Sequence, residues 1–292
     1  MKKLLFVINP KAGQKKRKNY IREVIEIFEN GGYQVGVKYT KKRGDGTEIS
    51  AKYGNRVDLI VCMGGDGTLN EVIEGMLKDN VQTPLGYIPA GSTNDFAHSL
   101  GLSTNPVEQA KRIISKPGRM LDMGCFNGRY FVYTASAGVF VKTSYATPQR
   151  LKNRLGHTAY ILAGAKEVFH LKPLRLKIET ENESIEGTYV FAAINNSTKV
   201  GGIMKLDKDL VKFNDGFFEL LLVDFPKNPL EFLKLVNKLF HQDFSGKIRL
   251  KQVKKVKITG CAGIDWSLDG EEEKGKEQVN FKVVPNAINF IY

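Results

Sequence analysis

Residues 64–68 read Gly-Gly-Asp-Gly-Thr, between an apolar run and a segment with helical spacing. A buried strand that ends in glycines and passes directly into a helix can bind phosphate, because glycine lets backbone N–H groups come close to a polyanion. We expect these glycines to adopt positive φ angles. Asp66 would repel a phosphate unless a cation lies between them, so the motif indicates a nucleotide bound with Mg²⁺. The alternative is an ordinary tight turn from strand to helix.

A second loop with similar chemistry spans residues 89–97 and reads Pro-Ala-Gly-Ser-Thr-Asn-Asp-Phe-Ala. It carries hydroxyls at Ser92 and Thr93 and a carboxylate at Asp95, where a helix would begin. Capping of that helix would by itself explain either hydroxyl. Together with the first glycine loop, however, the segment favours a site for phosphate.

Isolated carboxylates mark three expected strand ends: Asp66, Asp95 and Asp122. They could form a Mg²⁺ cluster through water, since Mg²⁺ usually keeps several of its water ligands. Farther along, Asp269 and Glu271 flank a glycine. Asp-Gly between two strands is typical of a hairpin turn. In a phosphoryl-transfer enzyme, one such carboxylate would instead accept the proton of the attacking hydroxyl.

The first ~125 residues alternate strand and helix patterns, as in a parallel sheet covered by helices. The expected strands are residues 4–8, 33–39, 57–63 and 84–89, and a helical pattern over residues 21–28 stops at two glycines. Ligands of such sheets bind beyond the carboxyl ends of the strands. We therefore expect the loops after the first, third and fourth strands to converge on one site.

From about residue 121 the sequence becomes rich in short β-type runs, which predicts a sandwich-like second domain. The runs are residues 130–134, 174–178, 188–194, 217–223, 253–258 and 279–284. Two helical patterns interrupt them, at residues 159–169 and 230–240. The second pattern is amphipathic, and packing on a sheet is favoured over facing a membrane. We predict domains over residues 1–123 and 124–292, and the sequence leaves open whether the last strand returns to the first domain.

Composition narrows the function classes. The chain has 292 residues and a net charge of +13, which will attract an anionic partner such as nucleic acid, acidic lipid or nucleotide. Basic residues gather over residues 11–18, 142–177 and 247–257, without a zinc-finger, RNP or homeodomain pattern, so we expect no nucleic-acid partner.

Cysteine and hydropathy patterns add three expectations. The three cysteines lack metal-ligand spacing and are expected to be buried apolar residues. No apolar stretch reaches the ~18 residues of a membrane span. The apolar run near the N-terminus is also too short for a signal peptide, so we expect a cytoplasmic protein.

Taken together, these motifs resemble the soluble bacterial diacylglycerol-kinase-like lipid kinases, which are related to sphingosine and ceramide kinases and more distantly to NAD kinases and 6-phosphofructokinases. The resemblance covers nearly the whole chain and rests on Asn-Pro-Lys-Ala-Gly at 9–13, Thr40 before Gly44-Asp45-Gly46, and the segments 64–72, 89–97, 121–124, 156–160, 214–220 and 268–271. It implies an ATP- and Mg²⁺-dependent kinase of diacylglycerol or a similar lipid. It also implies an α/β domain like that of NAD kinases and phosphofructokinases, followed by a β-sandwich-like lipid domain.

The resemblance assigns roles to individual residues. The implied nucleotide site is lined by Asn9, Pro10, Lys11, Ala12, Gly13, Thr40, Gly64, Gly65, Asp66, Gly67, Thr68, Leu69, Asn70, Gly91 and Ser92. Asp66, which also counts as catalytic, would hold the nucleotide's Mg²⁺ through water together with Asp95 and Asp122. Glu271 would be the general base, supported by Asp269. A structural Mg²⁺ would bind Asp215 and backbone oxygens near Lys212 and Phe217.

Several alternatives stay open at this point. The acceptor could be a sphingoid base or NAD, and a non-catalytic nucleotide or lipid sensor could keep the same fold. The lipid-kinase hypothesis gives the positive charge a role, which is to dock the protein on acidic phospholipid at the inner membrane surface. The sequence also leaves open a homodimer.

Overall fold

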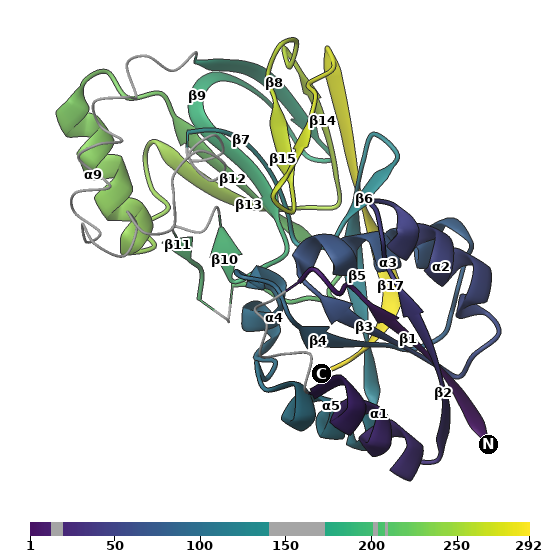
Figure 1. Ribbon diagram of the computed structural model, residues 1–292. Coiled ribbons are helices and arrows are strands. Elements are labelled where there is room, and N and C mark those ends of the chain that lie inside the picture. The colour runs from purple at the N-terminus through teal and green to yellow at the C-terminus, as the bar shows by residue number, and fades with distance from the viewer. Residues whose placement is uncertain (13–19, 140–172, 201–203, 208–209) are drawn as a thin grey trace. The chain divides into compact units, whose positions relative to one another are not determined.

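The computed structural model describes residues 1–12, 20–139, 173–200, 204–207 and 210–292 (Figure 1). Five sequence predictions lie outside these residues wholly or for the most part: Gly13, the basic runs at 11–18 and 142–177, the motif at 156–160 and the helix at 159–169. The chain divides into two compact units. Unit 1 comprises Met1–Met123, Arg129–Val132 and Val284–Tyr292, and unit 2 comprises Gly124–Gly128 and Tyr133–Val283.

Unit 1 contains a parallel sheet in the order β17–β4–β3–β1–β2. Its strands are β1 (Lys2–Ile8), β2 (Tyr33–Tyr39), β3 (Leu59–Gly64), β4 (Leu85–Pro89) and the end of β17 (Gln278–Ile291). Its helices are α1 (Tyr20–Asn30), α2 (Asp45–Gly54), α3 (Asp66–Lys78), α4 (Asp95–Leu100) and α5 (Pro106–Ser115). The four predicted strands are therefore confirmed, with ends within two residues.

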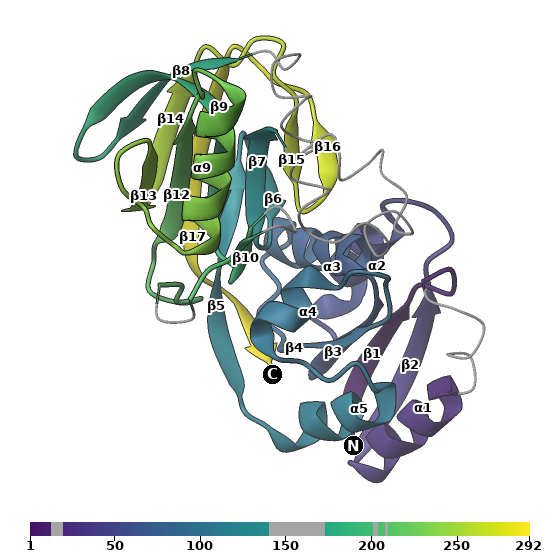
Figure 2. The same cartoon turned by 90° about the vertical axis from the view of Figure 1, so that its left-hand side faces the viewer.

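Helices cover both faces of this sheet. α1 contacts α5 and α2 contacts α3, and the two pairs lie on opposite sides of the strands (Figure 2). Strands buried on both faces read as continuous apolar runs, which is why all of Leu4–Ile8 is apolar and buried. On the α1 side, the ring of Phe6 meets that of Phe28 edge to face at 5.7 Å.

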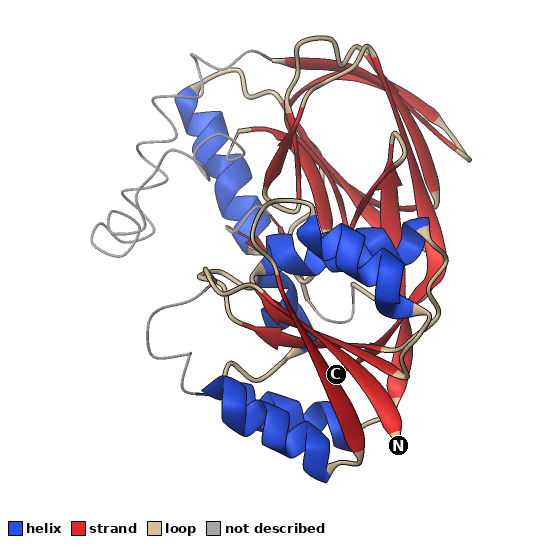
Figure 3. Cartoon of the chain, turned by 45° about the vertical axis from the view of Figure 1, so that its right-hand side comes forward, coloured by secondary structure: helices blue, strands red, loops and turns tan. Residues whose placement is uncertain are grey.

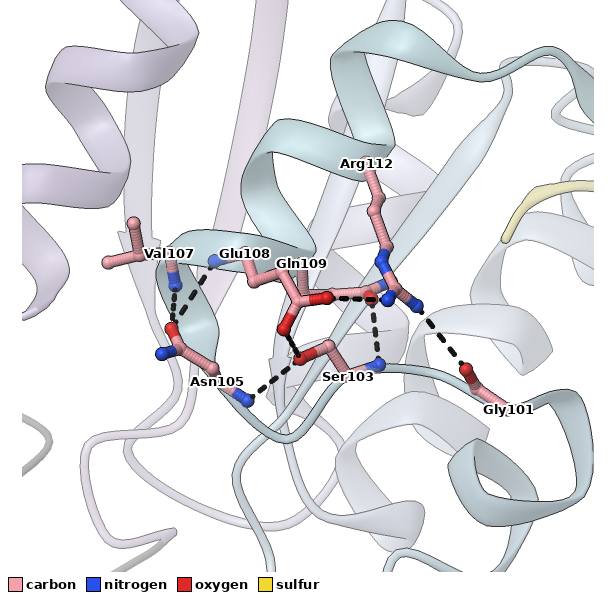
Figure 4. Close-up of polar contacts among 7 residues, drawn as sticks. All are labelled: Gly101, Ser103, Asn105, Val107, Glu108, Gln109 and Arg112. Atoms are coloured by element: carbon pink, nitrogen blue, oxygen red, sulfur yellow. Dashed lines mark hydrogen bonds and ion pairs between the residues drawn. The ribbon is translucent and has the colours of Figure 1, made fainter.

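Polar contacts fix the start of α5 (Figure 4). The Asn105 side chain caps the helix by accepting hydrogen bonds from the backbone N–H groups of Val107 (3.0 Å) and Glu108 (3.3 Å). Glu108 in turn pairs with Arg112 one turn later and accepts a hydrogen bond from the Ser103 hydroxyl. A cap of this kind contributes about 1 kcal/mol. It orients the helix whose other face covers the sheet.

Unit 2 consists mainly of antiparallel strands (Figure 3). They are β7 (Thr134–Gly138), β8 (Leu174–Thr180), β9 (Ser184–Asn195), β12 (Phe218–Asp224), β13 (Ile248–Val253), β14 (Lys255–Thr259), β15 (Trp266–Leu268) and β16 (Glu271–Glu273), with a short pair β10 (Lys199–Val200) and β11 (Met204–Lys205). The long strand β9 pairs with β7, β8 and β12. The prediction of an α/β first part and a β-rich second part is confirmed.

Three predicted strands have the wrong bounds. Residues 130–134 contain the end of β6 (Arg129–Phe131) and the first residue of β7, and residues 253–258 join the end of β13 to β14. Neither bend contains Gly, Pro, Asn or Asp, so no turn residue marks it in the sequence. β17 extends well beyond residue 284, through Pro285 and Asn286, which are typical of strand ends. It pairs with β14 in unit 2 and with β4 in unit 1.

Helix α9 (Pro229–Phe240) confirms the favoured interpretation of its amphipathic pattern. Phe232, Leu235 and Val236 are buried in one apolar cluster with side chains of β9 and β12. The face made by Phe232, Leu235 and Val236 therefore packs on the sheet, whereas Leu230 and Phe240, at the two ends of the predicted stripe, are exposed. Among the described residues, no helix is long and apolar enough to cross a membrane.

Candidate functional site

The glycine loop at residues 64–68 connects β3 to α3 without a left-handed residue. None of Gly64, Gly65 and Gly67 has a positive φ, so that expectation is wrong. The reason for glycine here is space. A Cβ atom on Gly64 would lie 2.6 Å from the Thr68 side chain. Close packing of the strand end on the first helical turn therefore requires glycine.

The two predicted phosphate loops touch each other through glycine backbone. A Cβ atom on Gly91 would lie 2.7 Å from the Cα of Gly65, and one on Gly65 would lie 3.3 Å from the Cα of Gly91. The Ala90 N–H also donates to the Gly64 carbonyl at 2.6 Å. The carboxyl ends of β3 and β4 thus form one continuous backbone surface, where an anion can approach N–H groups without a side chain in between.

The loop after β1 is joined to the same surface. The Asn9 side-chain amide donates to the Thr68 hydroxyl at 2.9 Å, and its carbonyl oxygen accepts from the backbone N–H of Lys11 at 3.0 Å. The Asn9 backbone N–H donates to the Met63 carbonyl, and that of Ala12 donates to the Asn9 carbonyl. The structure therefore brings the loop at residues 9–12 onto the first turn of α3.

Thr40 lies at the end of β2, buried, and its backbone N–H donates to the Ile8 carbonyl at 2.9 Å. The loop that follows is closed by Asp45, whose carboxylate accepts from the backbone N–H groups of Lys41 (2.7 Å) and Lys42 (3.1 Å). These two hydrogen bonds lower the pKa of Asp45. This loop occupies the carboxyl end of the strand next to β1.

Of the three carboxylates predicted at strand ends, Asp66 and Asp95 start helices and Asp122 lies within a strand. An Asp66 oxygen accepts from the backbone N–H of Asp95 at 3.0 Å, which ties the first residue of α3 to the first residue of α4. Asp122 is not at a strand end, contrary to expectation. It lies inside β5 (Gly118–Phe126), is buried, and accepts from the backbone N–H of Asn286 at 2.7 Å. The strand continues through Gly124 to Phe126.

Within the part of the chain that the structure describes, no three His, Cys, Asp or Glu side chains gather closely enough to bind a metal ion directly. A metal held through water by Asp66, Asp95 and Asp122 does not require such close contact.

Asn94 organises the second loop and was missed by the sequence interpretation. Its side chain accepts from the backbone N–H of Gly91 and donates to the Gly91 carbonyl, both at 2.9 Å. Asn94 has a φ of 50° and occupies the N-cap position of α4. The alternative explanation of Ser92 or Thr93 as the helix cap is therefore not supported, and both side chains are exposed. The available signal was Asn itself, because it tolerates the left-handed region better than most residues.

In unit 2, the Asp-Gly pair forms the predicted hairpin turn. Asp269 (φ 50°) and Gly270 (φ 87°) connect β15 to β16, as in the turns that favour Asp-Gly. The buried Asp269 carboxylate accepts from the backbone N–H groups of Tyr133 and Thr134, each at 2.9 Å. Glu271 starts β16 opposite Leu268 and is half-buried.

The loop before β12 carries the predicted structural metal residues. Asp215 accepts from the backbone N–H of Phe217 at 3.0 Å, and Lys212 is exposed. Burial, followed by the charge of Asp215, raises the pKa of Glu219 to about 8. Gln252 lies opposite Glu219 in β13, and it lowers this pKa by less than burial raises it. A buried acidic group beside a second carboxylate fits a nearby hard cation.

A family model that matches this chain describes a diacylglycerol kinase domain, and two relatives are named diacylglycerol kinases. Residues 3–126 match the diacylglycerol kinase catalytic domain, and residues 134–292 match the YegS C-terminal NAD kinase beta sandwich-like domain. The chain is 32% identical over 275 residues to a diacylglycerol kinase of Bacillus subtilis (strain 168), covering 93% of this chain and 90% of the relative. It is 30% identical over 274 residues to a diacylglycerol kinase of Staphylococcus saprophyticus, covering 92% and 89%.

The fold also resembles a solved structure. A crystal structure of a diacylglycerol kinase from Bacillus anthracis str. Sterne superposes with a TM-score of 0.79 at 23% identity, covering 100% of this chain and 97% of that chain. At this identity the likeness shows a shared fold.

Proposed function

Because this chain belongs to the diacylglycerol kinase family, we propose that it transfers the γ-phosphate of ATP to the free hydroxyl of diacylglycerol or a closely similar lipid. Lipid kinase activity, with ATP as the phosphate donor, follows from membership of the family. The choice of diacylglycerol is supported by the names of the two relatives reported above.

One observation carries the proposal for the ATP site. Loops at the carboxyl ends of three parallel strands are joined by backbone and side-chain contacts, through Asn9 with Thr68 and through Gly65 with Gly91. Beyond the carboxyl ends of strands is where open α/β sheets bind ligands. Backbone N–H groups at the start of α3 supply fixed positive dipoles, which stabilise phosphate charge without a reorganisation cost. Phosphoryl transfer depends mainly on such positioning and charge neutralisation.

We propose that Asp66, Asp95 and Asp122 hold the Mg²⁺ that accompanies ATP, through water molecules. Their oxygen chemistry fits this ion, and the hydrogen bond between Asp66 and the Asp95 backbone brings two of these residues together. When bound, Mg²⁺ neutralises charge on the phosphates. Asp215, with backbone oxygens of Lys212 and Phe217, is proposed as a separate structural site, supported by the buried Glu219 beside it.

Glu271 is proposed as the general base that takes the proton of the lipid hydroxyl as its oxygen attacks the γ-phosphate. Asp269 would support Glu271 by holding its hairpin in place, without taking the proton itself. Its two hydrogen bonds to the backbone of β7 fix the hairpin on which Glu271 sits. A base must be held within hydrogen-bonding reach of the proton it removes, so a fixed hairpin favours turnover.

The two parts of the chain would bind different substrates. We propose that residues 1–123 bind ATP and that residues 124–292 bind the lipid. The net charge of +13 would hold the enzyme at an acidic phospholipid surface on the inner side of the membrane, at about 1 kcal/mol for each basic residue near the surface. This attraction should weaken as salt is raised.

The test offers labelled ATP and Mg²⁺ with mixed vesicles that contain diacylglycerol, monoacylglycerol, phosphatidylglycerol or sphingosine, and NAD in solution. We expect label in phosphatidic acid. If a sphingoid base or NAD is labelled instead, that compound is the acceptor and the proposal of diacylglycerol is wrong. ATP binding without any labelled product would favour a sensor.

The role of Glu271 is tested with a matched pair in the same hairpin. Glu271→Gln should bind ATP like the parent while losing at least about 100-fold in turnover. Glu272 is the neighbouring carboxylate, exposed and paired with Lys274, and Glu272→Gln should stay close to the parent. Equal turnover of the Glu271→Gln variant and the parent would exclude Glu271 as the base.

A further inference from the structure

We infer that Glu71 positions the loop at residues 40–46 for ATP, acting through that loop and not by touching the nucleotide. The inference rests on the nucleotide site proposed above. Glu71 lies three residues after the glycine loop at 64–68, and the sequence interpretation gave it no role. It lies in α3, while the residues it contacts are the N-cap and the first turn of α2, where the loop that follows β2 ends.

The contact uses both oxygens of the Glu71 carboxylate. One accepts from the backbone N–H of Gly44 at 2.9 Å, and the other accepts from that of Gly46 at 3.0 Å. The Thr47 hydroxyl also donates to the Glu71 backbone carbonyl at 3.0 Å. Hydrogen bonds to a charged acceptor are stronger than neutral ones, and a two-pronged contact fixes orientation as well as distance.

The local backbone explains why another helix must supply this acceptor. The first N–H groups of a helix have no partner inside it, and a side chain at the N-cap position usually satisfies one of them. In α2 the N-cap residue is Gly44, which has a φ of 90° and no side chain. Glu71, which lies in α3, supplies the acceptor that an N-cap side chain of α2 would otherwise provide. The fit is tight, since a Cβ atom on Gly46 would lie 2.8 Å from that of Glu71.

The placement of Glu71 links two parts of the proposed ATP site. It lies five residues after Asp66, about one and a half turns along the same helix. Helix α3 therefore begins at the phosphate loop and, in its second turn, carries the carboxylate that binds the loop at residues 40–46. Glu71 would set the spacing between the two loops, and so the affinity for ATP in the ground state and transition state alike. Loss of uniform binding raises KM and leaves kcat unchanged.

The experiment compares Glu71→Gln with Glu74→Gln, a substitution on the same helix. Glu74 pairs with Lys78 at 2.8 Å and lies outside the proposed site, so this variant should match the parent. The Gln amide cannot accept from both glycine N–H groups. We expect the Kd for ATP, measured by calorimetry, and the KM for ATP to rise about tenfold. The kcat and the KM for lipid should change less than twofold, at a temperature where melting curves show every variant folded.

A second variant tests the contact from the opposite side. Gly46→Ala would displace the Glu71 carboxylate, so it should also weaken ATP binding. The double variant should then bind no more weakly than the worse single one, because both remove the same contact. A purely structural role would lower the melting temperature and leave the Kd for ATP unchanged.

The outcomes separate this inference from the proposed function. If the parent binds ATP and Glu71→Gln binds it equally well, or if kcat falls while the Kd holds, the role of Glu71 is overturned and the kinase proposal stands. If the parent binds ATP but labels no lipid, the proposed acceptor is wrong and the binding comparison still decides the role of Glu71. A parent that does not bind ATP refutes both.

Discussion

Gly91 lies against Gly65 so closely that a Cβ atom on Gly91 would come within 2.7 Å of the Gly65 Cα. With the hydrogen bonds from Ala90 to Gly64 and from Asp95 to Asp66, this contact joins the loop that starts α3 to the loop that leads into α4. Neither glycine has a positive φ, so the requirement for glycine at both positions is steric. The proposed ATP site depends on these two backbones staying together.

Gly91→Ala should separate the two loops. We expect the free energy of unfolding to fall by about 1–3 kcal/mol, because backbone atoms cannot move aside as a side chain can. The Kd for ATP should also rise, as measured by calorimetry on the folded protein. The control is Gly36→Ala in β2, where an added Cβ would meet its nearest atom at an ordinary 3.7 Å. If the two variants bind ATP equally well, the loops do not form one site.

Asp269→Ala should destabilise unit 2, since it leaves the backbone N–H groups of Tyr133 and Thr134 without their carboxylate acceptor. We expect a loss of about 1–3 kcal/mol in chemical denaturation. Asp269→Asn keeps an acceptor oxygen and tolerates the φ of 50°, so it should lose less than about 1 kcal/mol. Equal losses in both variants would show that these hydrogen bonds do not hold the hairpin.

The pH dependence of stability should report on Asp45. The backbone N–H groups of Lys41 and Lys42 lower the pKa of Asp45 in the folded state. A lowered folded pKa stabilises the protein above the unfolded pKa of about 4, and the effect disappears as pH falls through the folded value. Asp45→Asn should therefore melt below the parent at pH 7, and the two melting curves should converge in acid. A gap that stayed constant with pH would contradict this.

The three cysteines should react slowly in the folded protein. All are buried, and burial raises the pKa of Cys62 well above its usual range and that of Cys261 to about 11. Because the thiolate is the reactive form, thiol modification at pH 8 should be at least about tenfold slower than in denaturant. The release of colour from an aromatic disulfide reagent measures both rates. Rapid native reaction of Cys261 would show that its site opens to solvent.

Local pattern was sufficient for much of unit 1. The continuous apolar run at residues 4–8 predicts a strand covered on both faces, and the helical spacing from Ile21 to Phe28 predicts α1. Such periodicity depends only on neighbours in the chain. The bend between β13 and β14 and the passage of β17 through Pro285 could not be predicted in this way, because partner strands far away in sequence decide them.

The sequence by itself determined the residue types of the proposed site, since Gly-Gly-Asp-Gly-Thr, the second Gly loop and Asp-Gly-Glu are local motifs with chemistry of their own. Only the tertiary structure decided which of them meet. It placed Gly91 on Gly65, put Asp122 inside a strand, and assigned to Glu71 the backbone of a loop 25 to 27 residues earlier. Contacts between distant segments depend on how helices and strands pack, and no spacing along the chain encodes that.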